Sequence, residues 1–245
     1  MRHRTLAASL LLLCACAPLA AAQTATPTPA QAPTRTPAPA QTQDEPPPPP
    51  KPTPTPTPSP AQVEAKKKYD SLLEKAKKGE GAVDYKALRL AFFETPDYHP
   101  HAGMMVYRPL WGTVGQGNWP EAARQAEAVL EKNYVDINAH MVAYIAYREQ
   151  GDAEKAKLHR RWADGLIESV KAGGDGKTPA TAWHVISISE EYAVLRSMNL
   201  RPAGQALIKA DGHSYDEMKV IDPQTKAEVK YYFNVDKPFI AYGRK

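Results

Sequence analysis

The chain has 245 residues, of which 42% are hydrophobic, and a formal net charge of +4 at pH 7. From residue 61 onward it holds 27 Lys and Arg residues against 25 Asp and Glu residues, so this part is close to neutral. Such a balance excludes a dense basic surface, and we therefore expect no binding to nucleic acid. No motif in the sequence calls for a cofactor, and we expect none.

Residues 1–22 have the layout of a secretory signal. Arg2 and Arg4 precede an apolar run from Leu6 to Leu13, and small residues follow it up to Ala22. The apolar run is too short to cross a hydrocarbon core of about 30 Å, which takes about 20 helical residues. We therefore predict export of the protein to the periplasm or the outer cell envelope.

The signal segment is compatible with two kinds of processing. Its last residues, 20–22, are Ala-Ala-Ala and predict cleavage before Gln23. Residues 13–16, Leu-Cys-Ala-Cys, resemble the lipobox of bacterial lipoproteins, which implies lipidation of Cys16 and attachment to a membrane through that lipid alone. Both cysteines of the chain lie here, so the remainder has no disulfide and no thiolate metal site.

Residues 23–60 form a predicted disordered tether. They contain fifteen of the 24 prolines of the chain, interleaved with Thr, Ala and Gln. Alternating Thr-Pro pairs favour the extended polyproline conformation, which would give a fully stretched reach of about 120 Å. We expect residues 61–245 to form a single folded domain beyond this tether.

The first half of that domain is predicted to be helical. Residues 61–78 and 85–94 have helix-forming composition, and Pro96 and Pro100 interrupt the pattern after them. A repeat of 34 residues follows, in which Gly117 matches Gly151 and Ala122 matches Ala156. This spacing resembles the tetratricopeptide repeat, which implies two helix-turn-helix units over about residues 103–170.

The second half of the domain is predicted to contain a small sheet, over about residues 180–240. Thr178-Pro179 is a helix-start signal, and residues 184–188 are typical of a strand. Residues 190–198 indicate a helix, with Ser187 and Glu190 at capping-box spacing. Three more strands are predicted at residues 204–210, 215–221 and 229–235. The predicted fold class is α+β, with helical hairpins followed by a small antiparallel sheet and one helix.

Short phrases in the second half carry a further resemblance. Residues 174–178 (GDGKT), 190–192 (EEY) and 231–235 (YYFNV), in this order, resemble DUF4919, an exported bacterial family of unknown function. The resemblance would cover most of residues 61–235. It implies a fold and an exported location, and it brings no reaction or catalytic residue with it.

Four residues are the candidates for catalysis. His184, Asp175, Glu190 and Glu191 lie close in sequence and offer a base and three carboxyl groups for acid-base chemistry. Neighbouring helical residues point about 100° apart, so Glu190 and Glu191 do not share one site face-on. Their place at a helix start also suits the helix dipole, which is a structural explanation.

Aromatic residues of the helical repeat are the candidates for binding. Trp119, Tyr144, Tyr147 and Trp162 lie within it, and repeat arrays present concave surfaces on which an exposed ring anchors a partner. Our first hypothesis is a non-catalytic scaffold that binds a protein or peptide in the cell envelope. The alternative is a small envelope hydrolase with its site near His184, Glu190 and Glu191.

Overall fold

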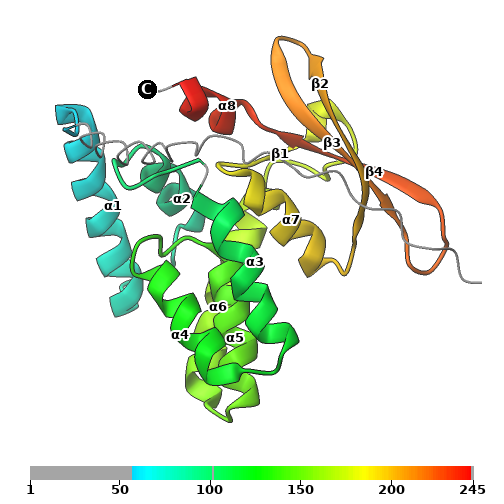
Figure 1. Ribbon diagram of the computed structural model, residues 1–245. Helices are drawn as coiled ribbons and strands as arrows, with labels where there is room; N and C mark the ends of the chain where they lie inside the picture. The colour runs from blue at the N-terminus through cyan, green and yellow to red at the C-terminus, as the bar shows by residue number, and fades with distance from the viewer. Residues whose placement is uncertain (1–56, 101, 244–245) are drawn as a thin grey trace, which may run out of the picture. The chain divides into compact units, whose positions relative to one another are not determined.

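The computed structural model describes residues 57–100 and 102–243, and for residues 102–105 and 242–243 it describes the backbone alone. The signal segment, Cys16 and nearly all of the predicted tether therefore lie outside the described residues. No helix within the described ranges is both long and apolar enough to cross a membrane. The described elements (Figure 1) are, in chain order, α1 (Pro60–Lys78), α2 (Tyr85–Phe93), α3 (Ala102–Gly115), α4 (Trp119–Leu130), α5 (Ile137–Glu149), α6 (Ala153–Lys171), the short 3-10 helix η1 (Pro179–Thr181), β1 (Trp183–His184), α7 (Ile188–Ser197), β2 (Pro202–Ala210), β3 (His213–Ile221), β4 (Glu228–Asn234) and α8 (Asp236–Gly243).

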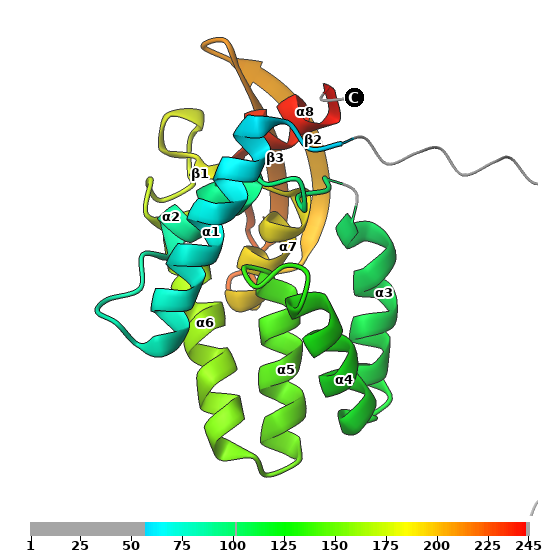
Figure 2. The same cartoon turned by 90° about the vertical axis from the view of Figure 1, so that its left-hand side faces the viewer.

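The helices α3 to α6 form an array of two hairpins. Each helix packs on the next one in the chain, and Figure 2 shows the four of them side by side. The turns of the two hairpins contain Gly117, with φ of 68°, and Gly151, with φ of 79°. Glycine adopts this left-handed conformation at little cost. The two helix-turn-helix units that the 34-residue repeat predicted are thus present.

Side-chain caps define where the helices of the array begin. Asn118 and Asp152 accept hydrogen bonds from the backbone N–H groups of Glu121 and Lys155 at the starts of α4 and α6. Asp136 caps α5 in the same way. Each cap satisfies one of the N–H groups that a helix start leaves without a partner.

Two hydrophobic clusters hold the domain together. The first lies within the array and consists largely of small residues, among them Ala122, Ala126, Ala143 and Ala146, each with no exposed surface. Small side chains allow these helices to approach closely. The second cluster joins α1, α2, α6, α7 and the inner face of the sheet, with Trp162, Leu195 and Phe233 fully buried in it.

The sheet has the strand order β1-β4-β3-β2. The last three strands form an antiparallel meander, in agreement with the predicted small antiparallel sheet. β1, however, pairs with β4 in parallel, with Trp183 opposite Phe233, so the sheet is mixed and the prediction of an antiparallel sheet needs correction. The predicted strand over residues 184–188 is also shorter than expected, because α7 already begins at Ile188.

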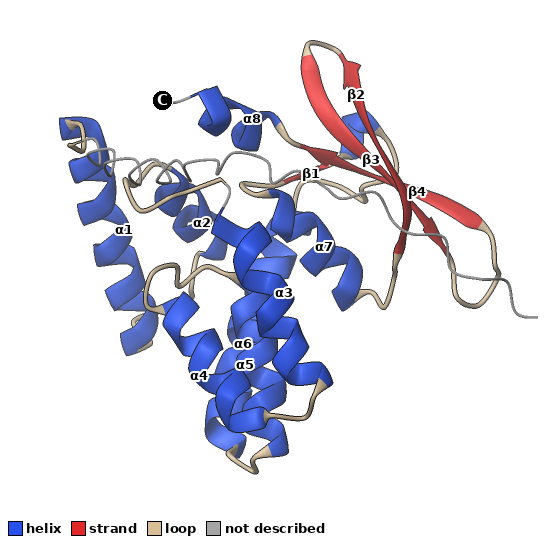
Figure 3. Ribbon diagram, viewed as in Figure 1, coloured by secondary structure: helices blue, strands red, loops and turns tan. Residues whose placement is uncertain are grey.

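Helix α7 lies between the helical array and the sheet, as Figure 3 shows. Its predicted capping box is not formed. Ser187 makes no cap hydrogen bond, and its hydroxyl group lies 2.8 Å from that of Ser189. Glu190 turns instead toward α2, where it meets a buried arginine. The fold class is α+β as predicted, with α8 as an additional helix after the sheet.

Candidate functional site

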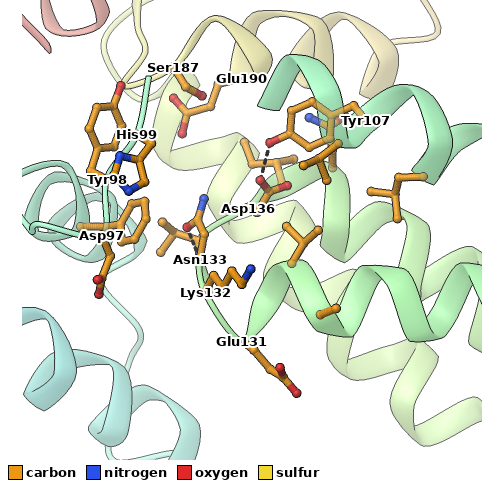
Figure 4. Close-up of a pocket in the computed structure, with 18 of the residues that line it drawn as sticks. Asp97, Tyr98, His99, Tyr107, Glu131, Lys132, Asn133, Asp136, Ser187 and Glu190 are labelled. Carbon is orange, nitrogen blue, oxygen red and sulfur yellow. Dashed lines mark hydrogen bonds between the residues drawn. The ribbon is translucent and has the colours of Figure 1, made fainter. Parts of the chain in front are cut away.

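A cleft of about 800 Å³ opens where the α2–α3 connection, α3, α4 and the segment before α7 meet. In Figure 4, Tyr98 and His99 lie on one side of it, Tyr107 lies on the other, and Asn133 and Asp136 lie between them. Much of the remaining lining is apolar, with the following side chains: Phe92, Val106, Leu110, Val129, Val135, Ile137 and Ile186. Concave sites of this size and composition commonly bind small molecules or peptide side chains.

Asp136 is a buried carboxyl group on the cleft, with only 6% of its surface exposed. One oxygen accepts the backbone N–H of Ala139 at 2.9 Å, and the other accepts the hydroxyl group of Tyr107. Burial raises the pKa of Asp136 to about 6, and the negative charge of Glu190 acts in the same direction. The two hydrogen bonds oppose this rise in pKa without cancelling it.

Glu190 is the second buried carboxyl group on the cleft, and it is neutralised from within the protein. Its two oxygens accept Nε and Nη2 of Arg89, at 2.7 and 2.5 Å, so the pair is bidentate. The backbone N–H of Ile186 donates to Glu190 as well, at 2.8 Å, and Arg89 also donates to the carbonyl oxygen of His184. This network fixes α2, α7 and the segment before α7 around one edge of the cleft.

The rim of the cleft carries exposed charges of both signs. Asp97, Glu131 and Lys132 lie on it. Arg124 lines it too, but its guanidinium group is held by Glu121 at 2.8 and 2.6 Å. The carboxylate of Asp97 lies 3.7 Å from Lys66 of α1, a weak exposed pair.

The four candidates for catalysis do not converge on one place. Only Glu190 lines the cleft. Glu191 is fully buried on the opposite side of α7, where burial and then the charge of Asp216 raise its pKa well above the usual range. Asp175 is exposed and accepts the hydroxyl group of Thr181 at 2.6 Å, and His184 has an exposed side chain. The four candidates are thus close in sequence but do not form one site.

The four aromatic candidates for binding are also distributed. Trp162 has no exposed surface and lies in the main core, so it is not available to a partner. Tyr147 stacks on the ring of His159, and Tyr144 lies beside the guanidinium groups of Arg148 and Arg160. Trp119 is half-buried. None of the four lines the cleft.

Of the residues that form the cleft, only Glu190 was singled out from the sequence as a site candidate. Asp136 precedes a helical stretch as Asp152 does, so the sequence contains a signal for its role as a cap, but none for its place on a cleft. Within the described residues, no group of three His, Cys, Asp or Glu side chains could hold a metal ion. In the same ranges no hydrogen bond joins a serine or threonine hydroxyl group to a histidine.

Comparison with known proteins confirms the family resemblance that the short phrases in the second half of the sequence predicted. A family described as a domain of unknown function (DUF4919) matches residues 63–244, a range that covers all described elements from α1 to α8 apart from the first three residues of α1. No curated protein and no solved structure matches the chain.

Proposed function

The chain belongs to the DUF4919 family, whose description assigns no activity, and we propose that its domain binds a protein or peptide segment in the cleft. The observation that carries this proposal is the cleft itself, about 800 Å³ in volume and lined largely by apolar and aromatic side chains. Its few buried polar groups sit at fixed places, as expected of a site that orients a ligand. The proposed site is thus the cleft, which α3 and α4 of the repeat help to form, rather than Trp119, Tyr144, Tyr147 and Trp162.

The proposed location is the cell envelope, after export. The signal pattern of residues 1–22 and the proline-rich composition of residues 23–60 support it. In this arrangement the tether sets the distance over which the domain reaches its partner. Cleavage before Gln23 would give a free protein, whereas lipidation of Cys16 would give a membrane-anchored one.

A hydrolase with its site near His184, Glu190 and Glu191 has less support. The carboxylate of Glu190 is occupied by Arg89, and Glu191 is enclosed on the far side of α7. Acid-base chemistry needs a titratable group within hydrogen-bond reach of a substrate. Neither glutamate meets that condition in this arrangement.

The experiment that tests the proposal blocks the cleft. Phage-displayed random peptides are selected on the intact protein, and the enriched peptides are synthesised and titrated by fluorescence anisotropy. Ala128 is exposed on α4 and lines the cleft, so Ala128→Trp places a large ring in the ligand space. We expect this variant to bind the peptides at least about tenfold more weakly.

Ala153→Trp is the matched control. Ala153 is also an exposed alanine in a helix, at the start of α6, and it does not line the cleft. This control is expected to bind as the wild type does. Failure to enrich any peptide over the bare support, or equal binding by Ala128→Trp, would contradict the proposed function.

A further inference from the structure

The two buried carboxyl groups on the cleft differ in how their charge is balanced. Glu190 has a full countercharge, because Arg89 binds both of its oxygens. Asp136 has only neutral donors, the Tyr107 hydroxyl group and the Ala139 backbone N–H. In the part of the chain that the structure describes, no ion pair includes Asp136. A buried carboxylate without a cation is costly, because its desolvation is not offset by an opposite charge.

The remaining charges on the cleft do not provide the missing cation. Arg124 is occupied by Glu121, and Lys132 is an exposed residue of the rim with no ion pair to Asp136. Asp97 and Glu131 add negative charge at the same rim. The lining therefore carries an excess of negative charge, with Asp136 as its buried member.

The walls of the cleft suit a long aliphatic stem that ends in a positive charge. Val129 and Leu110 offer apolar surface, and Phe92, Tyr98 and Tyr107 offer aromatic rings. Lysine and arginine bury their methylene groups along apolar surface while the charged end finds a polar partner. Aromatic faces also attract such cations.

The structure assigns to this cleft a basic side chain of the bound segment, a lysine amine or an arginine guanidinium group placed against Asp136. This inference rests on the proposed function and names the chemistry of its ligand. The bound cation would supply a countercharge to Asp136. The protein supplies one to Glu190 through Arg89. Asp136 is thus a specificity-determining residue, and an acidic or purely apolar segment would not satisfy it.

Three pools of fluorescein-labelled peptides test the inference. The peptides are random over uncharged residues, and their fixed central residue is lysine, norleucine or glutamate. At about pH 7.5 the lysine pool is expected to bind the intact protein about tenfold more tightly than the norleucine pool. Asp136→Asn is expected to lower the affinity of the lysine pool to that of the norleucine pool and to leave the norleucine pool unchanged.

Asp152→Asn is the matched control for this variant, since Asp152 caps α6 in the same manner and does not line the cleft. It should leave the affinities of all three pools unchanged. Equal affinity of the wild type for the lysine and norleucine pools would overturn the inference while the proposed function stands. A lysine preference that persists in Asp136→Asn, or tightest binding of the glutamate pool, would overturn it in the same way.

The pH dependence of the lysine preference gives a second measurement. Protonation removes the charge of Asp136 below its pKa of about 6, so the roughly tenfold preference for lysine should decline toward none as the pH falls from about 6 to about 5. A preference that stays constant down to about pH 5 would overturn the inference. The difference between wild type and Asp136→Asn isolates the contribution of Asp136 from that of the other charged groups. The other titratable and charged groups around the site are Tyr107 on α3, Glu190 with Arg89 behind it, Asp97 and His99 on the loop, and Glu131 and Lys132 at the end of α4. If none of the pools binds, the proposed function fails together with the inference.

Discussion

His140 of α5 and His159 of α6 face each other in the core of the second hairpin, with their Nδ1 atoms 3.0 Å apart. Nε2 of His140 lies 3.0 Å from the carbonyl oxygen of Tyr134, so this nitrogen carries the proton and Nδ1 is the acceptor. His159 then donates from Nδ1, while its Nε2 lies 3.2 Å from the carboxylate of Glu127, a contact that joins α4 to α6.

This arrangement predicts a loss of stability at acidic pH. Burial lowers the pKa of His140 from 6.5 to about 3. The unfolded chain therefore binds the proton between these two values and the folded chain does not, so stability falls as the pH falls below 6.5. The loss attributable to His140 is about 1.4 kcal/mol per pH unit.

Urea denaturation of the wild type and of His140→Gln at several pH values measures this effect. The glutamine retains a donor for the Tyr134 carbonyl oxygen and does not titrate. The stability advantage of the wild type over the variant should shrink by about 1.4 kcal/mol for each pH unit below 6.5. A difference that is independent of pH would mean that His140 is protonated in the folded protein.

Asp136 predicts a pH dependence of the opposite sign. Its pKa is raised from 3.8 to about 6, so the folded state binds the proton more strongly than the unfolded state between these values. The contribution of Asp136 to the stability of the folded state is therefore complete below pH 3.8 and is lost as the pH rises through 6. Asp136→Asn should therefore gain stability over the wild type as the pH rises, by up to about 3 kcal/mol above pH 6.

Thermal or urea unfolding at about pH 4 and about pH 7.5 checks this prediction. An asparagine still caps a helix, so the cap itself is retained. Asp152→Asn makes the same substitution at the half-exposed cap of α6, and it serves as the control for the change of the cap itself. A variant that is destabilised equally at both pH values would contradict the raised pKa of Asp136.

Glu190 and Glu191 are neighbours in the chain but lie in different surroundings. The variants Glu190→Gln and Glu191→Gln therefore form a matched pair. Glu190→Gln leaves the guanidinium group of Arg89 buried without a counterion and should cost about 3 kcal/mol. Burial and then the charge of Asp216 raise the pKa of Glu191 well above its usual range, so its neutral form is favoured and Glu191→Gln should cost less than about 1 kcal/mol at pH 7. As the pH rises, the glutamine variant should gain stability relative to the wild type, because burial disfavours the ionised form of Glu191.

Chemical denaturation of both variants at neutral and alkaline pH separates these outcomes. Similar losses for the two variants at pH 7 would indicate that Glu191 is ionised in the folded protein. A negligible loss for Glu190→Gln would indicate that the pair with Arg89 contributes nothing.

Local signals in the sequence predicted most of the helices and strands. The turns at Gly117 and Gly151 follow from one 34-residue repeat, and the strands β2, β3 and β4 lie where three strands were predicted. β1 has only two residues and thus no period to detect, so its parallel pairing was not predictable. Helix α8 contains Pro238 near its start and lies at the end of the described chain, where the sequence shows no helical periodicity.

The cleft was not predictable for a different reason. Tyr98, Tyr107, Asp136 and Ile186 line it from four separate segments of the chain. Arg89 and Glu190 are 101 residues apart in the chain. Only the packing of α2 and α7 against the array brings such residues together, and a single sequence carries no direct signal of that packing.

Gly165 of α6 lies where α2 packs closely on α6, so a substitution there tests the position of α2. A Cβ atom at this glycine would lie 2.2 Å from the ring of Tyr85, the first residue of α2. The ring is held in turn by an edge-on contact with Trp162, with centroids 5.3 Å apart. Gly165→Ala should therefore destabilise the domain by about 1–3 kcal/mol, although alanine is the better helix former.

Gly112 provides the matched substitution within a helix. It lies in α3, and an added Cβ atom would meet nothing within 4 Å, so Gly112→Ala should stabilise the domain by about 0.5–1 kcal/mol. Tyr85→Leu in the Gly165→Ala background should recover part of the loss, because it removes the ring that clashes. Equal stabilisation by the two alanine substitutions would show that α2 does not lie against α6 as described. Since α2 also carries Arg89, the same result would remove the basis for the neutralised state of Glu190 on the cleft.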